Sequence, residues 1–249
     1  MTQQLLNPEN LLNPSELLYS DEIVTELDIS HLVIEDDTPV DNLQSEKQQR
    51  LLVEPLYSSK VLLPPFLAAA NVGLFYKLKG EPIVPDVMLS LGVQCADDFS
   101  KKQNRSYFVW EFGKVPEVCI EIVSNSKGNE LDSKKADYAR IGIAYYVVFD
   151  PLEQLQQETE LNGKLLNVWI LTAGEYMEMT VPFWLQTIGL GLTLWEGQFE
   201  EAVTRLWLRW CDRDGHVIPT GAERADEAEL RAKRLADRLR AMGVNPDDV

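Results

Sequence analysis

The sequence predicts a mixed α/β (α+β) fold with a partly parallel sheet, an antiparallel extension and a C-terminal helix. Short apolar runs bounded by proline, glycine and charged residues recur from about residue 66 to residue 200, which is typical of strands. Residues 116–151 read as strand, helix and strand, the order of a right-handed crossover between parallel strands. Residues 221–249 repeat apolar positions at helical spacing. The 249 residues, 45% of them hydrophobic, can bury one sizeable core.

The first elements follow an acidic leader. Residues 1–40 are acidic, contain several prolines and repeat Leu-Leu-Asn-Pro, so we expect a loosely ordered segment. Residues 41–200 form the expected main domain, which begins with a helix running from Asp41 into Pro55. The next three apolar segments are expected to be strands, and they lie at 67–78, 83–91 and 106–112.

The segment Pro116–Ser124 predicts a strand that is buried on both faces. Its side chains alternate, so Val118, Ile120 and Ile122 face one layer while Cys119, Glu121 and Val123 face the other. Glu121 is therefore a carboxylate inside an otherwise apolar strand.

A helix follows this strand. Asn129 is expected as its N-cap with Asp132 three residues later, and Gly142 follows its last residue. Residues 144–151 then predict a buried strand that ends at a proline.

The remaining elements extend this core. We expect strands at 165–171, 176–184 and 191–199, and a hairpin or linker at 201–220 that turns at Asp214-Gly215. Residues 221–249 predict an amphipathic helical tail about three heptads long, which is short for a stable coiled coil. Packing onto its own domain, self-association and binding of another helix all remain open. The seam of the tail consists of Ala225, Ala228, Ala232, Leu235, Leu239 and Met242.

Two strand carboxylates predict a metal-dependent phosphodiesterase site. Asp86 stands at the start of one expected strand, and Glu121 stands midway along the next core strand. Mg²⁺ prefers oxygen ligands, so we expect these two carboxylates and the backbone carbonyl of Ile122 to bind it, with Mn²⁺ as a substitute.

A lysine on the following helix is expected to complete this site. At about 100° per residue, Lys134 lies within roughly 30° of the centre of the apolar stripe, whereas Lys135 lies roughly 70° away. An inward lysine needs a partner, and Glu121 is the nearest candidate. The alternative is that the stem of Lys134 covers the sheet while its ammonium reaches water.

Taken together, these motifs resemble those of a known superfamily. Pro85-Asp86, the Glu-Ile-Val at 121–123 and the K-x3-Y-x3-G pattern at 134–142 resemble the PD-(D/E)XK nuclease superfamily. Over roughly residues 41–200, the chain is most similar to the Uma-type family of restriction-endonuclease-like proteins. The resemblance implies a restriction-endonuclease-like core, with a central mixed sheet flanked by helices, and a Mg²⁺-dependent endonuclease acting on DNA.

The chain departs from the superfamily pattern at one position. The superfamily lysine is expected two residues after Glu121, where this chain has Val123. In the Uma-type family the lysine is thought to have moved to the following helix, where Lys134 stands. The resemblance also implies a glutamate on the first helix, for which Glu46 is a candidate. Fold does not fix activity, so the alternative is a catalytically silent nuclease-fold module that binds or assembles through the leader and the tail.

The net charge of −17 argues against a nucleic-acid partner, but its distribution weakens that objection. Residues 51–150 contain 11 basic and 12 acidic residues, so the segment that contains the site is nearly neutral. Its basic residues could line a groove, although solubilisation of the surface is the favoured explanation for them. They are Lys77, Lys79, Lys101, Lys102, Arg105, Lys114 and Lys127.

The sequence contains no signal peptide or membrane span, which predicts a soluble, cytoplasmic protein; a homodimer is an open possibility. The three cysteines contain no CxxC pair and are expected to be reduced. His31 and His216 have no second metal ligand at useful spacing in the sequence, so neither is expected to be catalytic.

Overall fold

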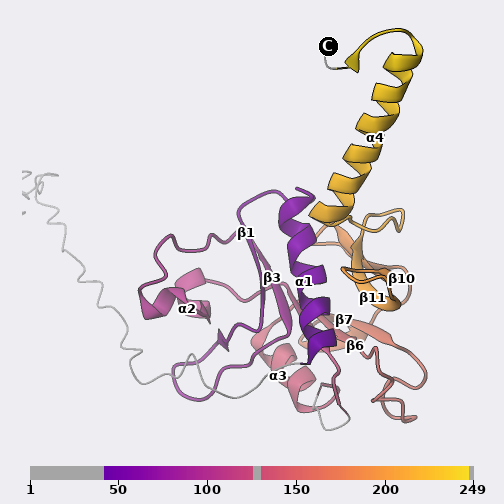
Figure 1. The fold of residues 1–249 in the computed structure, drawn as a ribbon. Coiled ribbons are helices and arrows are strands. Elements are labelled where there is room, and N and C mark those ends of the chain that lie inside the picture. The colour runs from indigo at the N-terminus through magenta and orange to yellow at the C-terminus, as the bar shows by residue number, and fades with distance from the viewer. Residues whose placement is uncertain (1–41, 126–129, 247–249) are drawn as a thin grey trace, which may run out of the picture. The chain divides into compact units, whose positions relative to one another are not determined.

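The structure is a computed structural model that describes residues 42–125 and 130–246 (Figure 1). The chain divides into two units, Met1–His31 and Leu32–Val249, and all of the described residues belong to the second. The expected acidic leader lies outside the described residues. Three sheets are formed within this part of the chain.

The main sheet has six strands in the order β1-β3-β5-β6-β7-β8. Its one parallel pair is β5 with β6, and the other neighbours are antiparallel. The expected mixed α/β fold, with a central mixed sheet, an antiparallel extension and a C-terminal helix, is thus confirmed. The strands are β1 (Phe66–Ala70), β3 (Val87–Leu91), β5 (Val118–Ile122), β6 (Tyr145–Phe149), β7 (Leu166–Thr172) and β8 (Glu175–Glu178).

One face of the main sheet is covered by α1 (Leu43–Ser58) and by a second, antiparallel sheet. Asn42 caps α1 by accepting hydrogen bonds from the backbone N–H groups of residues 44 and 45. Leu52 of α1 is buried with Val118 of β5 and Leu208 of the second sheet, and Figure 1 shows α1 beside β3. The second sheet contains β9 (Phe183–Leu185), β10 (Leu190–Gln198) and β11 (Thr204–Cys211).

The opposite face of the main sheet is covered by α3 (Ser133–Ile141), the crossover helix between β5 and β6. Tyr138 of α3 is buried together with Cys119 and Val123 of β5 and with Tyr146 of β6. The alternation predicted for the Pro116–Ser124 strand is confirmed, because Val118 and its even-numbered neighbours face the α1 side.

The ends of α3 differ in part from expectation. Gly142 follows the helix at φ 95°, in the left-handed region that favours glycine, as expected. The helix begins at Ser133 with Asp132 at the N-cap position, so Asp132 does not lie inside the first turn. Asn129, the expected N-cap, lies outside the described residues.

Three of the expected strand boundaries were wrong. The 67–78 segment is divided between β1 and the short strand β2 (Leu74–Phe75), because Asn71 adopts a positive φ of 53°. The 106–112 segment forms β4 (Tyr107–Phe108), which pairs with β2, and then turns into the short helix α2 (Val109–Phe112). Stacking of Tyr107 on Phe112, with ring centroids 4.3 Å apart, accompanies this turn.

The 176–184 segment is divided between β8 and β9, which belong to different sheets. The expected hairpin at 201–220 was also wrong in its pairing. β11 pairs along its length with β10, and only an isolated bridge joins Cys211 to Val217.

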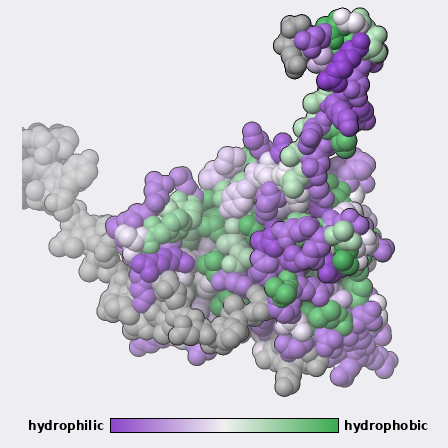
Figure 2. Space-filling view, in the orientation of Figure 1, coloured by the Kyte–Doolittle hydropathy of each residue, from purple (hydrophilic) through white to green (hydrophobic). Residues whose placement is uncertain are grey.

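The C-terminal helix α4 (Gly221–Ala241) is attached through its first turn. Thr220 and Glu223 form a capping box, and the Glu223 carboxylate also accepts a hydrogen bond of 2.7 Å from Arg209, which is buried in β11. Beyond that turn the seam is largely exposed: Leu235 is 55% and Met242 70% exposed. Figure 2 shows hydrophobic residues interrupting the hydrophilic surface of this helix.

No helix among residues 42–125 and 130–246 combines the length and apolar character needed to cross a membrane. Cys95, Cys119 and Cys211 are all free thiols, as expected.

Candidate active site

The antiparallel pairing of β3 with β5 brings Asp86 to Glu121. Val87 lies opposite Ile120, so one further step along the ladder places Asp86 beside Glu121. Asp86 Oδ2 accepts a 2.5 Å hydrogen bond from the backbone N–H of Ile122. The two carboxylates predicted from the sequence therefore lie at the same edge of two neighbouring strands.

Glu121 is fully buried and has a partner at each carboxylate oxygen. Tyr138 donates a hydrogen bond of 2.7 Å to Oε1, and Lys134 Nζ lies 2.9 Å from Oε2. Burial raises the pKa of Glu121 above its ordinary value of 4.5, although Lys134 and Tyr138 both favour the charged form. The ammonium and the hydroxyl thus satisfy a carboxylate that would otherwise be costly to bury.

Lys134 points toward the site, in agreement with the helical geometry. Burial is the largest single influence and lowers its pKa, but the charge of Glu121, the hydrogen bond to it and the charges of Glu130 and Asp86 together raise the pKa above 10.5. Lys134 therefore stays protonated near neutral pH. Lys135 points elsewhere, with its Nζ 4.1 Å from the centre of the Trp169 ring, and burial lowers its pKa.

The residue of α1 that reaches the site is Gln49, not Glu46. Glu46, the candidate catalytic glutamate of the first helix, forms an ion pair with Arg50 instead. No contact with the site supports it as a catalytic residue. Gln49 is buried, and its Nε2 lies 3.4 Å from Asp86 Oδ1 and 3.3 Å from Asn71 Oδ1. Gln49 was not predicted from the sequence, although a polar residue on the apolar face of an amphipathic helix was a signal that could have identified it.

Glu130 is a second residue near the site that was not predicted from the sequence. Its Oε1 lies 3.7 Å from Lys134 Nζ, and its Oε2 is buried without a hydrogen-bond partner among the described residues. The backbone carbonyl of Glu130 accepts a 2.7 Å hydrogen bond from the Tyr146 hydroxyl. Lys134 therefore lies between two carboxylates, Glu121 and Glu130.

Tyr138→Phe is expected to destabilise the protein by about 1–2 kcal/mol, because Glu121 loses a buried hydrogen bond. The pKa of Glu121 should rise further, since the lost donor favours the carboxylate. A raised pKa in the folded state means that stability is full below pH 4.5 and is lost as the pH rises through the folded pKa.

Chemical denaturation at a series of pH values from below 4.5 upward measures both the loss of stability in Tyr138→Phe and the change in its pH dependence. Glu121→Gln is the reference, because its side chain at position 121 cannot titrate. Relative to this reference, the wild type should lose stability as the pH rises, and Tyr138→Phe should lose more. Equal stability of Tyr138→Phe and the wild type at every pH would contradict the role of the hydroxyl.

The basic residues of this segment are only partly available for a ligand. Lys114 pairs with Glu117 and donates to the Leu91 carbonyl. Arg105 donates to backbone carbonyls of its own loop. Lys77, Lys79 and Lys101 are exposed, and Lys127 lies outside the described residues. Within the described residues, Lys114 and Arg105 are thus already engaged, so fewer basic side chains are available for a ligand than the sequence suggested.

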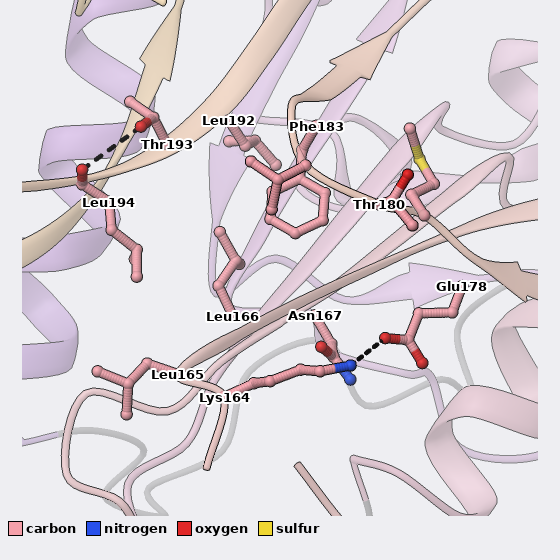
Figure 3. A pocket seen from close by; sticks show the side chains of 12 residues that line it. Lys164, Leu165, Leu166, Asn167, Glu178, Thr180, Phe183, Leu192, Thr193 and Leu194 are labelled. Carbon is pink, nitrogen blue, oxygen red and sulfur yellow. Dashed lines mark hydrogen bonds and ion pairs between the residues drawn. The ribbon is translucent and has the colours of Figure 1, made fainter. Parts of the chain in front are cut away.

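A pocket of about 600 Å³ lies between the end of the main sheet and the second sheet. Leu166, Phe183 and Leu192 line its apolar side, and the ion pair of Lys164 with Glu178 lies beside them (Figure 3). Asp86, Glu121 and Lys134 are not among its lining residues. The pocket is therefore separate from the carboxylate site.

The expectation that His216 has no companion ligand was wrong. Asp212, Asp214 and His216 offer ligand atoms within 4.8 Å of one another, in the turn that follows β11. Asp212 accepts hydrogen bonds from the backbone N–H groups of Asp214 and His216, which explains how the turn gathers them. His31 lies outside the described residues.

Comparison with known proteins gives one family match. The model of the Uma2 family, described as "Putative restriction endonuclease", matches residues 31–189. Among solved structures, the chain is similar to a putative nuclease belonging to DUF820 from Anabaena variabilis ATCC 29413, with 16% sequence identity and a TM-score of 0.38. That similarity covers 58% of this chain and 71% of the other. None of the curated proteins matches the chain.

Proposed function

The chain belongs to the Uma2 family, and from this membership we propose that it is a divalent-cation-dependent endonuclease that hydrolyses phosphodiester bonds of DNA. The proposal rests on the convergence of Asp86, Glu121 and Lys134 at the place where β3 begins and β5 ends. An acidic pair with one lysine is a constellation suited to phosphodiester hydrolysis. The family description and the site thus support the same class of reaction.

The residues at the site fit a hard divalent cation. Asp86 and Glu121 would supply carboxylate oxygens. The N–H and C=O of a strand residue point to the same side, so the Ile122 carbonyl faces the side on which its N–H meets Asp86. Oxygen donors of this kind suit Mg²⁺, with Mn²⁺ as a substitute. When bound, the cation would activate a water and offset the charge that develops on the phosphate.

Lys134 would act as a cation and hydrogen-bond donor in this reaction. Its raised pKa keeps it protonated, so it is suited to stabilise the developing negative charge and unsuited to act as a general base. Tyr138 and Gln49 would orient Glu121 and Asp86, respectively, through the hydrogen bonds that they donate.

Incubation of the purified chain with supercoiled plasmid and Mg²⁺ or Mn²⁺ tests the proposal. Nicked or linear plasmid is expected with the cation and none with a chelator. Parallel incubation with single-stranded DNA and with RNA identifies the preferred substrate. Cleavage that continues undiminished in the chelator would overturn the cation dependence.

The exposed seam of α4 supports a second copy of the chain as a partner. Leu235, Leu239 and Met242 occupy successive seam positions and have no cover within the described residues beyond the partial burial of Leu239. We therefore include a homodimer through α4 in the proposal.

Light scattering of the protein as it elutes from a size-exclusion column is expected to give a dimer mass for the full chain. After deletion of residues 221–249 it should give a monomer mass. Leu235→Glu should also give a monomer, because it places a charge in the seam. Leu230→Glu is the matched control, since Leu230 is 59% exposed and lies off the seam. An equal number of subunits in the full and the shortened chain would exclude this role of α4.

A further inference from the structure

Lys134 contacts an oxygen of Glu121, and the proposed function requires Glu121 to bind a divalent cation. Tyr138 donates to one oxygen of Glu121, and the Lys134 ammonium lies 2.9 Å from the other. Each carboxylate oxygen has two lone pairs, so one hydrogen bond at each oxygen does not by itself exclude a cation. A divalent cation at the oxygen that contacts Lys134 would, however, place two positive charges next to each other, and they would repel. This repulsion favours a loaded site in which one of the two partners has moved.

Of the two partners, Lys134 is the one that can move. Tyr138 is fully buried, and its ring packs on Tyr146 with centroids 5.0 Å apart. The Lys134 side chain is 35% exposed and reaches Glu121 on a flexible four-carbon stem. A change of rotamer in Lys134 thus costs far less than displacement of the packed tyrosine.

Glu130 offers the Lys134 ammonium a second carboxylate partner. Its Oε1 is already 3.7 Å from Lys134 Nζ, so a shift of about 1 Å would give a charge-assisted hydrogen bond of ordinary length. Its Oε2 is buried with no hydrogen-bond partner among the described residues. The hydrogen bond from Tyr146 to the Glu130 carbonyl holds the backbone of Glu130 in place.

On the basis of the proposed function, we propose that Glu130 is a positioning residue that accepts the Lys134 ammonium when Glu121 binds the divalent cation. The lysine then remains at the site, beside the position of the phosphate, instead of competing for the Glu121 oxygen. Charge supports this arrangement: three carboxylates, Asp86, Glu121 and Glu130, surround one ammonium, so the cluster has a net charge of −2 when all of them are ionised. Such a cluster matches a divalent cation and retains the lysine.

Calorimetric titration of Mn²⁺ into four proteins tests this role: the wild type, Glu130→Gln, Lys134→Met and the double variant. Glu130→Gln is expected to weaken Mn²⁺ binding by about tenfold, the size of effect typical of groups that orient a ligand. In Glu130→Gln, the lysine has lost its second partner and stays on Glu121. The double variant should bind Mn²⁺ within about twofold of Lys134→Met, because no lysine remains to compete.

Two results would overturn the positioning role of Glu130. An equal loss of affinity from Glu130→Gln in the wild-type and Lys134→Met backgrounds would make Glu130 a direct ligand. No loss in either background would leave it without a role. Glu130→Asp, which keeps the carboxylate, should retain more affinity than Glu130→Gln, and thermal unfolding verifies that each variant is folded.

Failure of the inference is distinguishable from failure of the proposed function. If the wild type binds no Mn²⁺, the proposed function falls and the inference falls with it. If the wild type binds Mn²⁺ and Asp86→Ala does not, while Glu130→Gln binds normally, then only the inference is wrong.

Discussion

Asp86→Ala is expected to reduce Mg²⁺-dependent plasmid cleavage by about a thousandfold, because the several kcal/mol supplied by a bound cation are lost with its carboxylate. Calorimetry with Mn²⁺ should show the loss of binding directly. Glu121→Gln should have the same effect, since it keeps the shape of the side chain and removes its charge. Both carboxylates lie where β3 begins and β5 ends, so each would supply part of the same cation site. We therefore expect neither to compensate for the loss of the other.

Asp97→Ala is the matched control for Asp86→Ala, because Asp97 is an exposed carboxylate in the loop that follows β3. It should cleave and bind Mn²⁺ as the wild type does. Cleavage that persists unchanged in Asp86→Ala would refute the site. Absence of Mn²⁺ binding in the wild type would instead favour the alternative, a nuclease-fold module that assembles with partners and does not cut.

Lys134→Met should lower the rate of cleavage by about a hundredfold while leaving Mn²⁺ bound, because the variant removes a donor to the developing charge and no cation ligand. Single-turnover cleavage at saturating Mn²⁺ measures this effect. The methionine keeps the length and apolar stem of lysine, so packing against the sheet is largely retained.

Lys135→Met provides the comparison for Lys134→Met. Lys135 stacks over Trp169 and does not contact Glu121, so its replacement should change the cleavage rate less than twofold. A larger loss in Lys135→Met than in Lys134→Met would assign the catalytic lysine to the other position and contradict the geometry of α3.

The parts of the site that could be predicted from the sequence are those that depend on local periodicity. Alternation along a strand placed Glu121 on the face that carries α3, and the angle per helical residue distinguished Lys134 from Lys135. Both arguments need only the geometry of one element. They succeeded for β5 and α3 because each element is regular over the residues concerned.

The parts that were missed depend on packing between elements or on irregular backbone. Gln49 reaches Asp86 because α1 lies across the main sheet, and no local pattern relates residues 37 positions apart. Glu130 precedes the first turn of α3, where no helical period applies. The aromatic segment at 106–112 favours a strand by propensity, yet stacking between Tyr107 and Phe112 accompanies a helical turn there.

The capping of α4 has a consequence for the order in which the chain folds. Glu223 stabilises the first turn of this helix through the local capping box with Thr220 and also through Arg209, a side chain buried in β11. An isolated helix of 21 residues with little tertiary contact has a costly nucleus. The ion pair with Arg209 lowers this cost beyond what the capping box provides, and it requires β11 to be in place. We therefore expect α4 to reach its full stability only when the second sheet has formed.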